Sequence, residues 1–265
     1  MEGKHSMYYP KQIPYLLNKE FRENIEYKEY NVKELEDYCM CIWTMKSKKI
    51  LNKTISNNIL PDACIDIVID FVSNTISFAG FSKGTKDFKL DKKIDYMGVR
   101  LKPSIFYLLF NVAADKVMDN EIAFSAIEKE DNIDRILELE NTNERIEYLK
   151  MYLFKKVKVQ KEMPFMEIVE KLYDNPKEQS VTDIAKKLGY HERNLYRVFK
   201  ADFGVSPKVL LNIIRLHLCL TLILEKKMSL IDIAFFCGFY DQSHLIKEIK
   251  KYTSISPLKI IEEYQ

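Results

Sequence analysis

The sequence predicts an α+β fold in which a β-rich N-terminal domain precedes an all-α C-terminal domain. Short segments rich in β-branched residues lie between residues 64 and 103, and polarity alternates along them. From about residue 181 onward, apolar residues instead recur at helical spacing. A chain of 265 residues is long enough for two domains with separate cores. We expect these domains at residues 1–158 and 159–265.

Three segments of the N-terminal domain are predicted strands. They are CIDIVIDF at residues 64–71, TISFAG at residues 75–80 and YMGVRLKP at residues 96–103. After the third strand the apolar pattern becomes helical, first over residues 104–118 and again over residues 132–154. The N-terminal domain is therefore expected to be a β-rich domain of the sensor or dimerisation kind, with helices after its strands.

Four polar residues of this domain are candidate effector-binding groups: Asp62, Asp66, Asp70 and Arg100. Isoleucines alternate with Asp66 and Asp70, so these aspartates share one face of the first strand. Arg100 lies in the middle of the third strand, where it can meet an anion or pair with an aspartate. The alternative interpretation is an internal salt bridge or a hydrated sheet face. A metal site is not expected, because hard cations generally gather their ligands from a turning loop.

Composition favours a soluble cytoplasmic protein without a membrane partner. Hydrophobic residues make up 47% of the chain and charged residues 30%, which is the profile of a compact soluble protein. No apolar run reaches the roughly 18 residues that cross a bilayer. The first residues, MEGKHSMYYPKQ, also lack the apolar core of a signal peptide.

The sequence contains no recognisable catalytic or metal motif. Its five cysteines are odd in number and scattered, and no second closely spaced pair accompanies Cys39 and Cys41. A Gly-rich phosphate loop, a nucleophile elbow and a coupled Ser-His-Asp spacing are also missing from the sequence. We therefore expect no enzyme activity, no cofactor and no bound metal.

Two C-terminal segments share a pattern of helix, glycine turn and helix. The segment at residues 184–190 returns at residues 233–239, and after one extra residue the segment at residues 199–207 returns at residues 249–257. Each copy carries a small alanine in its first helix, which lets the two helices cross steeply. Two copies are too few for a solenoid, so each must be a small motif in its own right.

The two copies are predicted helix-turn-helix units at about residues 180–203 and 229–253. Gly189 and Gly238 lie at the turns, where glycine readily adopts a positive φ. Between the units, residues 209–227 form one long helical pattern with few breakers, which predicts a linker helix.

Polar and basic residues occupy the face of each second helix that the core leaves free. They are Arg193, Tyr196, Arg197 and Lys200 in the first unit, and Gln242, Ser243, His244, Lys247 and Lys250 in the second. Arginine can bond guanine bidentately, glutamine can do so for adenine, and lysine can hold phosphates. Either helix alone has the alternative interpretation of an ordinary solvated face. Two copies together favour DNA contact.

Short motifs in this region form a recognisable set. They are DIAKKLGY at residues 183–190, GVSP at 204–207, IDIA at 231–234, CGF at 237–239, DQSH at 241–244 and SP at 256–257. In this order they make residues 165–260 similar to the DNA-binding domain of the AraC/XylS family of bacterial transcription regulators. The resemblance implies that one protomer places two recognition helices in successive major grooves, about 34 Å apart.

The segments LPDACIDIVIDF, ISFAGFSKGTKDF and GVRLKPS are similar to an uncharacterised N-terminal domain that often accompanies this DNA-binding domain. The implied partners are double-stranded DNA, RNA polymerase and a small-molecule effector, for a monomer or a homodimer. Two alternatives stay open. One is an effector-independent DNA-binding protein whose N-terminal domain only dimerises or contacts polymerase, and the other is a cysteine-based enzyme or adduct sensor.

Overall fold

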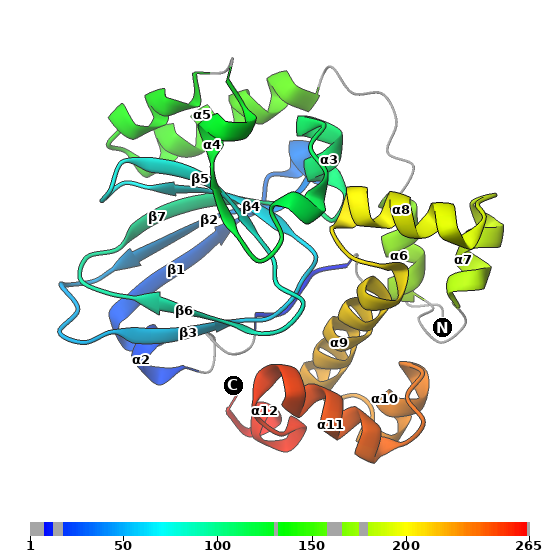
Figure 1. Cartoon of the computed structure of the whole chain (residues 1–265). Coiled ribbons are helices and arrows are strands. Elements are labelled where there is room, and N and C mark those ends of the chain that lie inside the picture. The colour runs from blue at the N-terminus through cyan, green and yellow to red at the C-terminus, as the bar shows by residue number, and fades with distance from the viewer. Residues whose placement is uncertain (1–7, 13–17, 130–131, 158–165, 175–179, 264–265) are drawn as a thin grey trace.

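A computed structural model describes residues 8–12, 18–129, 132–157, 166–174 and 180–263. Figure 1 shows a β-rich N-terminal part beside a helical C-terminal part, which confirms the predicted α+β class. The expected boundary between residues 158 and 159 lies outside the described residues and stays a prediction.

Two antiparallel sheets form the N-terminal part. Their strands are β1 Ile25–Tyr30, β2 Cys39–Ser47, β3 Ile55–Ile59, β4 Ile65–Asp70, β5 Thr75–Gly80, β6 Lys86–Leu90, β7 Asp95–Leu101 and β8 Glu121–Ala123. The larger sheet has the order β1-β2-β7-β4-β5-β8, and the smaller sheet pairs β3 with β6. The three strands predicted from the sequence are confirmed as β4, β5 and β7, which are neighbours in the larger sheet.

The larger sheet has an apolar face and a polar face. The helices α3 Ile105–Phe110, α4 Phe124–Ile127 and α5 Thr142–Val157 cover the apolar face (Figure 1). Ile65, Ile67 and Ile69 of β4 pack into the core beneath these helices. Because side chains alternate along a strand, Asp66 and Asp70 lie on the opposite face, toward the smaller sheet.

The helical stretches of the N-terminal part are shorter than the sequence predicts. Instead of one helix over residues 104–118, α3 is capped by Asn111, whose φ is 52°, and the short 3-10 turn η2 (Ala114–Lys116) follows. Asparagine tolerates this left-handed conformation, which ends the helix. The predicted helix over residues 132–154 is likewise divided, into the 3-10 turn η3 (Ile133–Glu138) and α5.

The C-terminal part confirms both helix-turn-helix units and the linker helix. Its helices are α6 Met166–Asp174, α7 Val181–Lys187, α8 Glu192–Phe203, α9 Pro207–Glu225, α10 Leu230–Phe236, α11 Gln242–Thr253 and α12 Pro257–Glu263. The linker helix α9 begins two residues earlier than predicted. Ser206 caps it by accepting a hydrogen bond from the Val209 N–H at 3.4 Å, and Pro207 occupies the first helical position.

The two units begin in the same physical way. The Ser180 hydroxyl accepts from the Asp183 N–H at 3.1 Å, and the Ser229 hydroxyl accepts from the Asp232 N–H at 3.2 Å. These caps satisfy N–H groups that the first turn of a helix leaves free. Each first helix then ends before a glycine with positive φ, which is 69° at Gly189 and 78° at Gly238. The repeat in the sequence is therefore a repeat of caps and turns.

The substitution Ser254→Gly should raise the free energy of unfolding by about 0.5–1 kcal/mol. Ser254 ends α11 at a φ of 62°, in the place where Gly204 ends α8 at a φ of 72°. A Cβ is strained in this left-handed region, and glycine removes the strain. Urea unfolding of the two proteins measures the difference.

The reverse change, Gly204→Ser, is the matched control. A Cβ at residue 204 would lie 3.3 Å from the Ala114 backbone, so this substitution should destabilise the protein. A lower stability of Ser254→Gly would contradict the strain assigned to Ser254.

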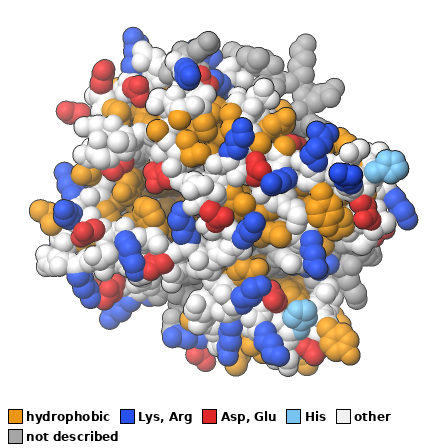
Figure 2. Space-filling model, in the orientation of Figure 1, with side chains coloured by type: hydrophobic (Ala, Val, Ile, Leu, Met, Phe, Trp, Pro, Cys, Tyr) orange, Lys and Arg blue, Asp and Glu red, His pale blue; other side chains and the backbone are white. Residues whose placement is uncertain are grey.

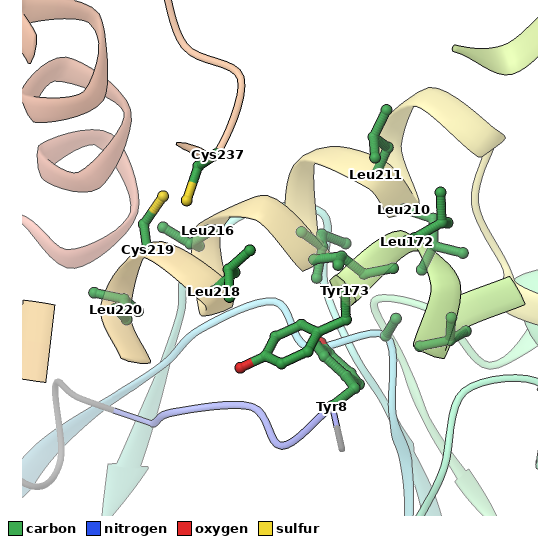
Figure 3. Close-up of a cluster of buried hydrophobic side chains, with 14 of the residues drawn as sticks. Tyr8, Leu172, Tyr173, Leu210, Leu211, Leu216, Leu218, Cys219, Leu220 and Cys237 are labelled. Carbon is green, nitrogen blue, oxygen red and sulfur yellow. The ribbon is translucent and has the colours of Figure 1, made fainter. Parts of the chain in front are cut away.

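The N-terminal and C-terminal parts share one hydrophobic cluster. Tyr8, Leu60 and Phe81 of the N-terminal part are buried in the cluster built around α9. Figure 3 shows Tyr8 beside Tyr173 of α6, and their ring centroids are 5.4 Å apart. Helix α9 has the length and mean hydropathy (1.6) of a membrane span, but 67% of that window is buried inside the protein. It is the central core helix of the C-terminal part.

His217 connects α9 to the N-terminal part through two hydrogen bonds. Its side chain is fully buried, its Nδ1 accepts a hydrogen bond from the Lys11 N–H at 3.0 Å, and its Nε2 donates to the Pro61 carbonyl at 2.7 Å. Burial lowers the pKa of His217 to about 4, so the imidazole is neutral at pH 7. Pro61 belongs to the segment that enters β4, and the contact therefore joins that strand to the linker helix.

Candidate functional site

The exposed face of α8 carries the four residues expected to contact DNA from the first unit. Leu195 and Phe199 of this helix are buried in the core. The candidate residues Arg193, Tyr196, Arg197 and Lys200 are all exposed. The Lys200 ammonium lies 3.3 Å from the Asp115 carboxylate of η2, because α8 packs against α3 and η2 of the N-terminal part.

Helix α11 presents the second set of candidates. Leu245 and Ile249 are buried, which places them where Leu195 and Phe199 lie in α8. Four of the five candidates are exposed: Ser243, His244, Lys247 and Lys250. The fifth, Gln242, is half-buried at the first helical position. A displacement of fifty residues therefore pairs Arg197 with Lys247, and Lys200 with Lys250.

The start of α11 has a side-chain cap and a ring contact with the turn before it. The Asp241 carboxylate accepts from the His244 N–H at 2.7 Å and caps the helix. The His244 ring also meets the edge of Phe239 at a centroid distance of 5.2 Å. His244 is thus oriented by the turn, although its exposed side chain still faces solvent.

Two exposed residues beside these sets were not identified from the sequence. Asn194 lies on α8 next to Arg193, and an asparagine can bond adenine in the major groove. Tyr240 lies in the turn before α11 and is 86% exposed. In the sequence, the spacing between equivalent residues of the two copies changes from 49 to 50 between residues 239 and 245. This extra residue was the sequence feature that indicated a different turn in the second unit.

Basic side chains extend over both second helices. Figure 2 shows Lys and Arg side chains in blue over α8 and α11 on the face that the two helices share, with fewer acidic side chains between them. This surface has the charge that contact with a phosphate backbone requires.

A cavity of about 360 Å³ lies between the two sheets of the N-terminal part. The polar face of the larger sheet forms one wall, and residues of β3 and β6 form the other. All four candidate effector-binding residues line it: Asp62, Asp66, Asp70 and Arg100. This volume is within the range of small-molecule sites.

Arg100 and two of the aspartates form a buried ionic cluster. The Arg100 Nε lies 3.4 Å from Asp66 Oδ1 and 3.8 Å from Asp62 Oδ2, and Arg100 is only 8% exposed. The Glu29 carboxylate approaches the Arg100 Nη1 at 3.8 Å. Burial raises the pKa of Asp62 to about 6, against the opposing effect of Arg100, and it raises the pKa of Asp66 as well.

Asp70 does not join this cluster. Its carboxylate accepts hydrogen bonds from the Val72 N–H at 2.8 Å and from the Ser73 hydroxyl at 2.6 Å, in the turn between β4 and β5. It faces the cavity from the rim, where its main structural role is in the turn.

The cysteines are placed as core residues. All five are buried and free, and burial raises the pKa of Cys39 and of Cys41 to about 12. Figure 3 shows the Cys219 and Cys237 sulfurs facing each other between α9 and the end of α10. A thiol with a raised pKa is a poor nucleophile, so Cys39 and Cys41 suit packing better than covalent chemistry.

Comparison with known proteins defines the class of the C-terminal part. The model of a family described as a helix-turn-helix domain matches residues 166–263, and a second family, described as a domain of unknown function (DUF6597), matches residues 32–123. The C-terminal part is a helix-turn-helix domain of the AraC type, a domain found in transcription regulators.

Three relatives illustrate this similarity. The Msm operon regulatory protein of Streptococcus mutans is 33% identical over 85 residues, which are 32% of this chain and 31% of the relative. The HTH-type transcriptional regulator MtrA of Neisseria gonorrhoeae is 26% identical over 91 residues, which are 34% and 30% of the two chains. A solved AraC-type transcriptional regulator of Chromobacterium violaceum is 26% identical, with a TM-score of 0.36, and covers 38% of this chain and 90% of that one. The chain spans about a third of the length of the two curated relatives.

Proposed function

We propose that the protein is a cytoplasmic transcription regulator that binds a specific site on double-stranded DNA, with α8 and α11 in successive major grooves. The observation that supports this most is the pair of helix-turn-helix units on one buried linker helix, each with an exposed polar face on its second helix. Two such units in one protomer can read a site without twofold symmetry.

The proposed contacts divide by chemistry. Bases are read by Arg193, Tyr196 and Arg197 in the first unit and by Gln242, Ser243, His244 and Lys247 in the second. Phosphates are held by Lys200 and Lys250. The first helix offers two arginines and the second offers mostly neutral donors, so the two half-sites should differ in sequence and in sensitivity to salt.

The N-terminal part is proposed to control DNA binding through a small molecule in the cavity, with RNA polymerase as a further partner. Leu60 and Asp62 line the cavity on either side of Pro61, whose carbonyl accepts the hydrogen bond from His217 of α9. A ligand that moves this segment therefore acts directly on the helix that carries both DNA-binding units. This short connection favours an effector over a purely dimerising domain.

The substitution Arg197→Ala should weaken binding to the specific site by about 1–3 kcal/mol and relax base preference at one position. Lys250→Ala should instead weaken binding to all sequences alike and lower the salt slope by about one, because a phosphate contact releases a counterion without reading a base. Footprinting on DNA from the protein's own genome neighbourhood defines the site. Fluorescence anisotropy at several salt concentrations then compares that site with a scrambled duplex.

The control variant is Lys89→Ala, which removes an exposed lysine of β6, in the N-terminal part. It should leave both affinities unchanged. If Arg197→Ala weakened the specific and scrambled duplexes equally, Arg197 would not be a base reader. If footprinting found no protected site at all, the proposed function itself would be wrong.

A further inference from the structure

The indole of Trp43 is one of the side chains that line the cavity. It extends from β2 across Gly98 of β7, where an added Cβ would lie only 2.4 Å from the ring. Its Nε1 donates a hydrogen bond to Asp66 of β4 at 2.9 Å. Gly98 leaves room for the ring because it has no side chain, and Asp66 fixes the position of the ring through the hydrogen bond. The indole therefore crosses three neighbouring strands.

Two further aromatic rings line the same space. Phe88 of β6 and Tyr96 of β7 meet at a centroid distance of 6.5 Å with their planes at 64°. Aromatic faces carry negative electrostatic potential, and they attract organic cations. The cavity therefore combines aromatic surfaces from both sheets.

The charged residues around the cavity leave an excess of negative charge. They are the carboxylates Asp62, Asp66, Asp70 and Glu121 and the cations Lys86 and Arg100. Lys86 is exposed. Arg100 lies within 4 Å of two of the aspartates and donates from Nη2 to Asp66 at 3.5 Å, although its buried Nε has no hydrogen bond among the described residues. Asp70 and Glu121 both help to raise the pKa of Tyr96, after the larger effect of burial, as expected where their negative charges act together. An anionic ligand would meet repulsion here, whereas a cation would complete the charge balance.

Asn57 supplies a buried acceptor in the same cavity. It is 4% exposed, it lines the cavity from β3, and no donor among the residues that the structure describes reaches its Oδ1. Buried acceptors are normally paired, and a lone one is costly to the folded protein. A ligand that carries an N–H group would satisfy it.

We propose that the cavity binds a small organic amine, with an N–H of the ligand on Asn57 Oδ1 and its positive charge among the aromatic rings and carboxylates. This inference rests on the proposed function, in which the same cavity holds the effector, and it assigns the chemical class of that effector. A metal ion is a poorer fit, because the described residues contain no group of three His, Cys, Asp or Glu side chains suited to hold one.

Trp43 makes the proposal directly measurable, because it is the only tryptophan of the chain. The full-length protein without DNA is titrated with three probes of one carbon skeleton: cyclohexylamine, cyclohexanol and cyclohexanecarboxylate. The amine should change the Trp43 fluorescence and raise Tm, since a ligand of the native state stabilises it. The alcohol should bind at least about ten-fold more weakly, and the carboxylate should have no effect.

Asn57→Leu and Asn58→Leu form a matched pair of variants. Asn58 is the next residue of β3, so it points away from the cavity. Asn57→Leu should fold and raise the Tm of the ligand-free protein, because it removes a buried acceptor that none of the described residues pairs. It should also lower the affinity for cyclohexylamine by about ten-fold. Asn58→Leu should leave the affinity for cyclohexylamine unchanged.

Three results would overturn the assignment. They are a carboxylate that binds as well as the amine, an amine that leaves Trp43 fluorescence unchanged up to about 10 mM, and equal losses of amine binding in the two variants. Footprinting on the same preparation keeps the two proposals apart. Specific DNA binding without amine binding would refute only the ligand class, and amine binding without specific DNA binding would refute only the proposed regulator.

Discussion

Replacing Arg100 with methionine should destabilise the protein by about 3–5 kcal/mol at pH 7. Among the described residues, the guanidinium is the only cation within 4 Å of the carboxylates of Asp62, which is buried, and Asp66, which is half-buried. Methionine fills a similar volume but leaves two desolvated negative charges uncompensated. Chemical denaturation of the full chain without ligand measures the loss.

The loss of unfolding free energy caused by Arg100→Met should become smaller as the pH is lowered. Without the guanidinium, the pKa of each aspartate in the folded state rises further above its unfolded value near 3.8. The folded protein then binds protons more tightly than the unfolded chain, so its stability recovers as pH falls below the raised pKa. The double variant Arg100→Met with Asp66→Asn should recover part of the loss at pH 7.

The control for this experiment is Lys89→Met, which breaks an exposed ion pair with Asp87. Surface pairs contribute about 0–1 kcal/mol, so a small effect is expected. If Arg100→Met were as mild as this control, the buried cluster would not be a structural requirement of the N-terminal part.

The substitution His217→Gln should change the pH dependence of stability by about 3 kcal/mol. Burial, and to a smaller extent Arg100 and Lys11, lower the pKa of His217 to about 4 from its usual value near 6.5. In the unfolded chain, His217 therefore binds a proton below about pH 6.5. In the folded protein it binds this proton only below about pH 4. Wild-type stability is lost through this window, and glutamine has no proton to take up.

The measurement is the difference in unfolding free energy between the wild type and His217→Gln at pH 7 and pH 4. At pH 7 the wild type should be more stable, because glutamine lacks the buried ring that packs against Tyr8 and loses more side-chain freedom when it is fixed in the same place. At pH 4 that advantage should vanish or reverse. Asp62 and Asp202, whose pKa values are raised to about 6, act in the opposite direction but are present in both proteins. A constant difference would show that His217 titrates normally in the folded state.

The C-terminal part could be predicted closely from sequence because its signals are local. A cap such as Ser180, a turn glycine such as Gly189 and apolar residues at helical spacing each act within one or two turns of helix. The candidate DNA contacts were predicted as the residues of each second helix that the core positions leave on the surface. The half-buried state of Gln242 and the exposure of Tyr240 depend on the exact turn geometry, which spacing alone did not fix.

The cavity could be predicted only in part, because it depends on contacts between distant segments. Alternation along β4 correctly indicated that Asp66 and Asp70 share a face, and the pairing of Arg100 with an aspartate was one of two interpretations. The opposite wall was not foreseen. Its strands, ISNNI at Ile55–Ile59 and KDFKL at Lys86–Leu90, are short and polar, and they become strands by pairing with each other.

The unequal second helices of the two units would give a bound protomer a direction along the duplex. If α8 presents arginines to one half-site and α11 presents serine, histidine and lysine to the other, only one orientation of the protein matches a given operator. Inverting the operator would then carry the N-terminal part from one flank of the site to the other. The orientation of the site in a promoter would thus determine whether the N-terminal part points toward the start of transcription or away from it.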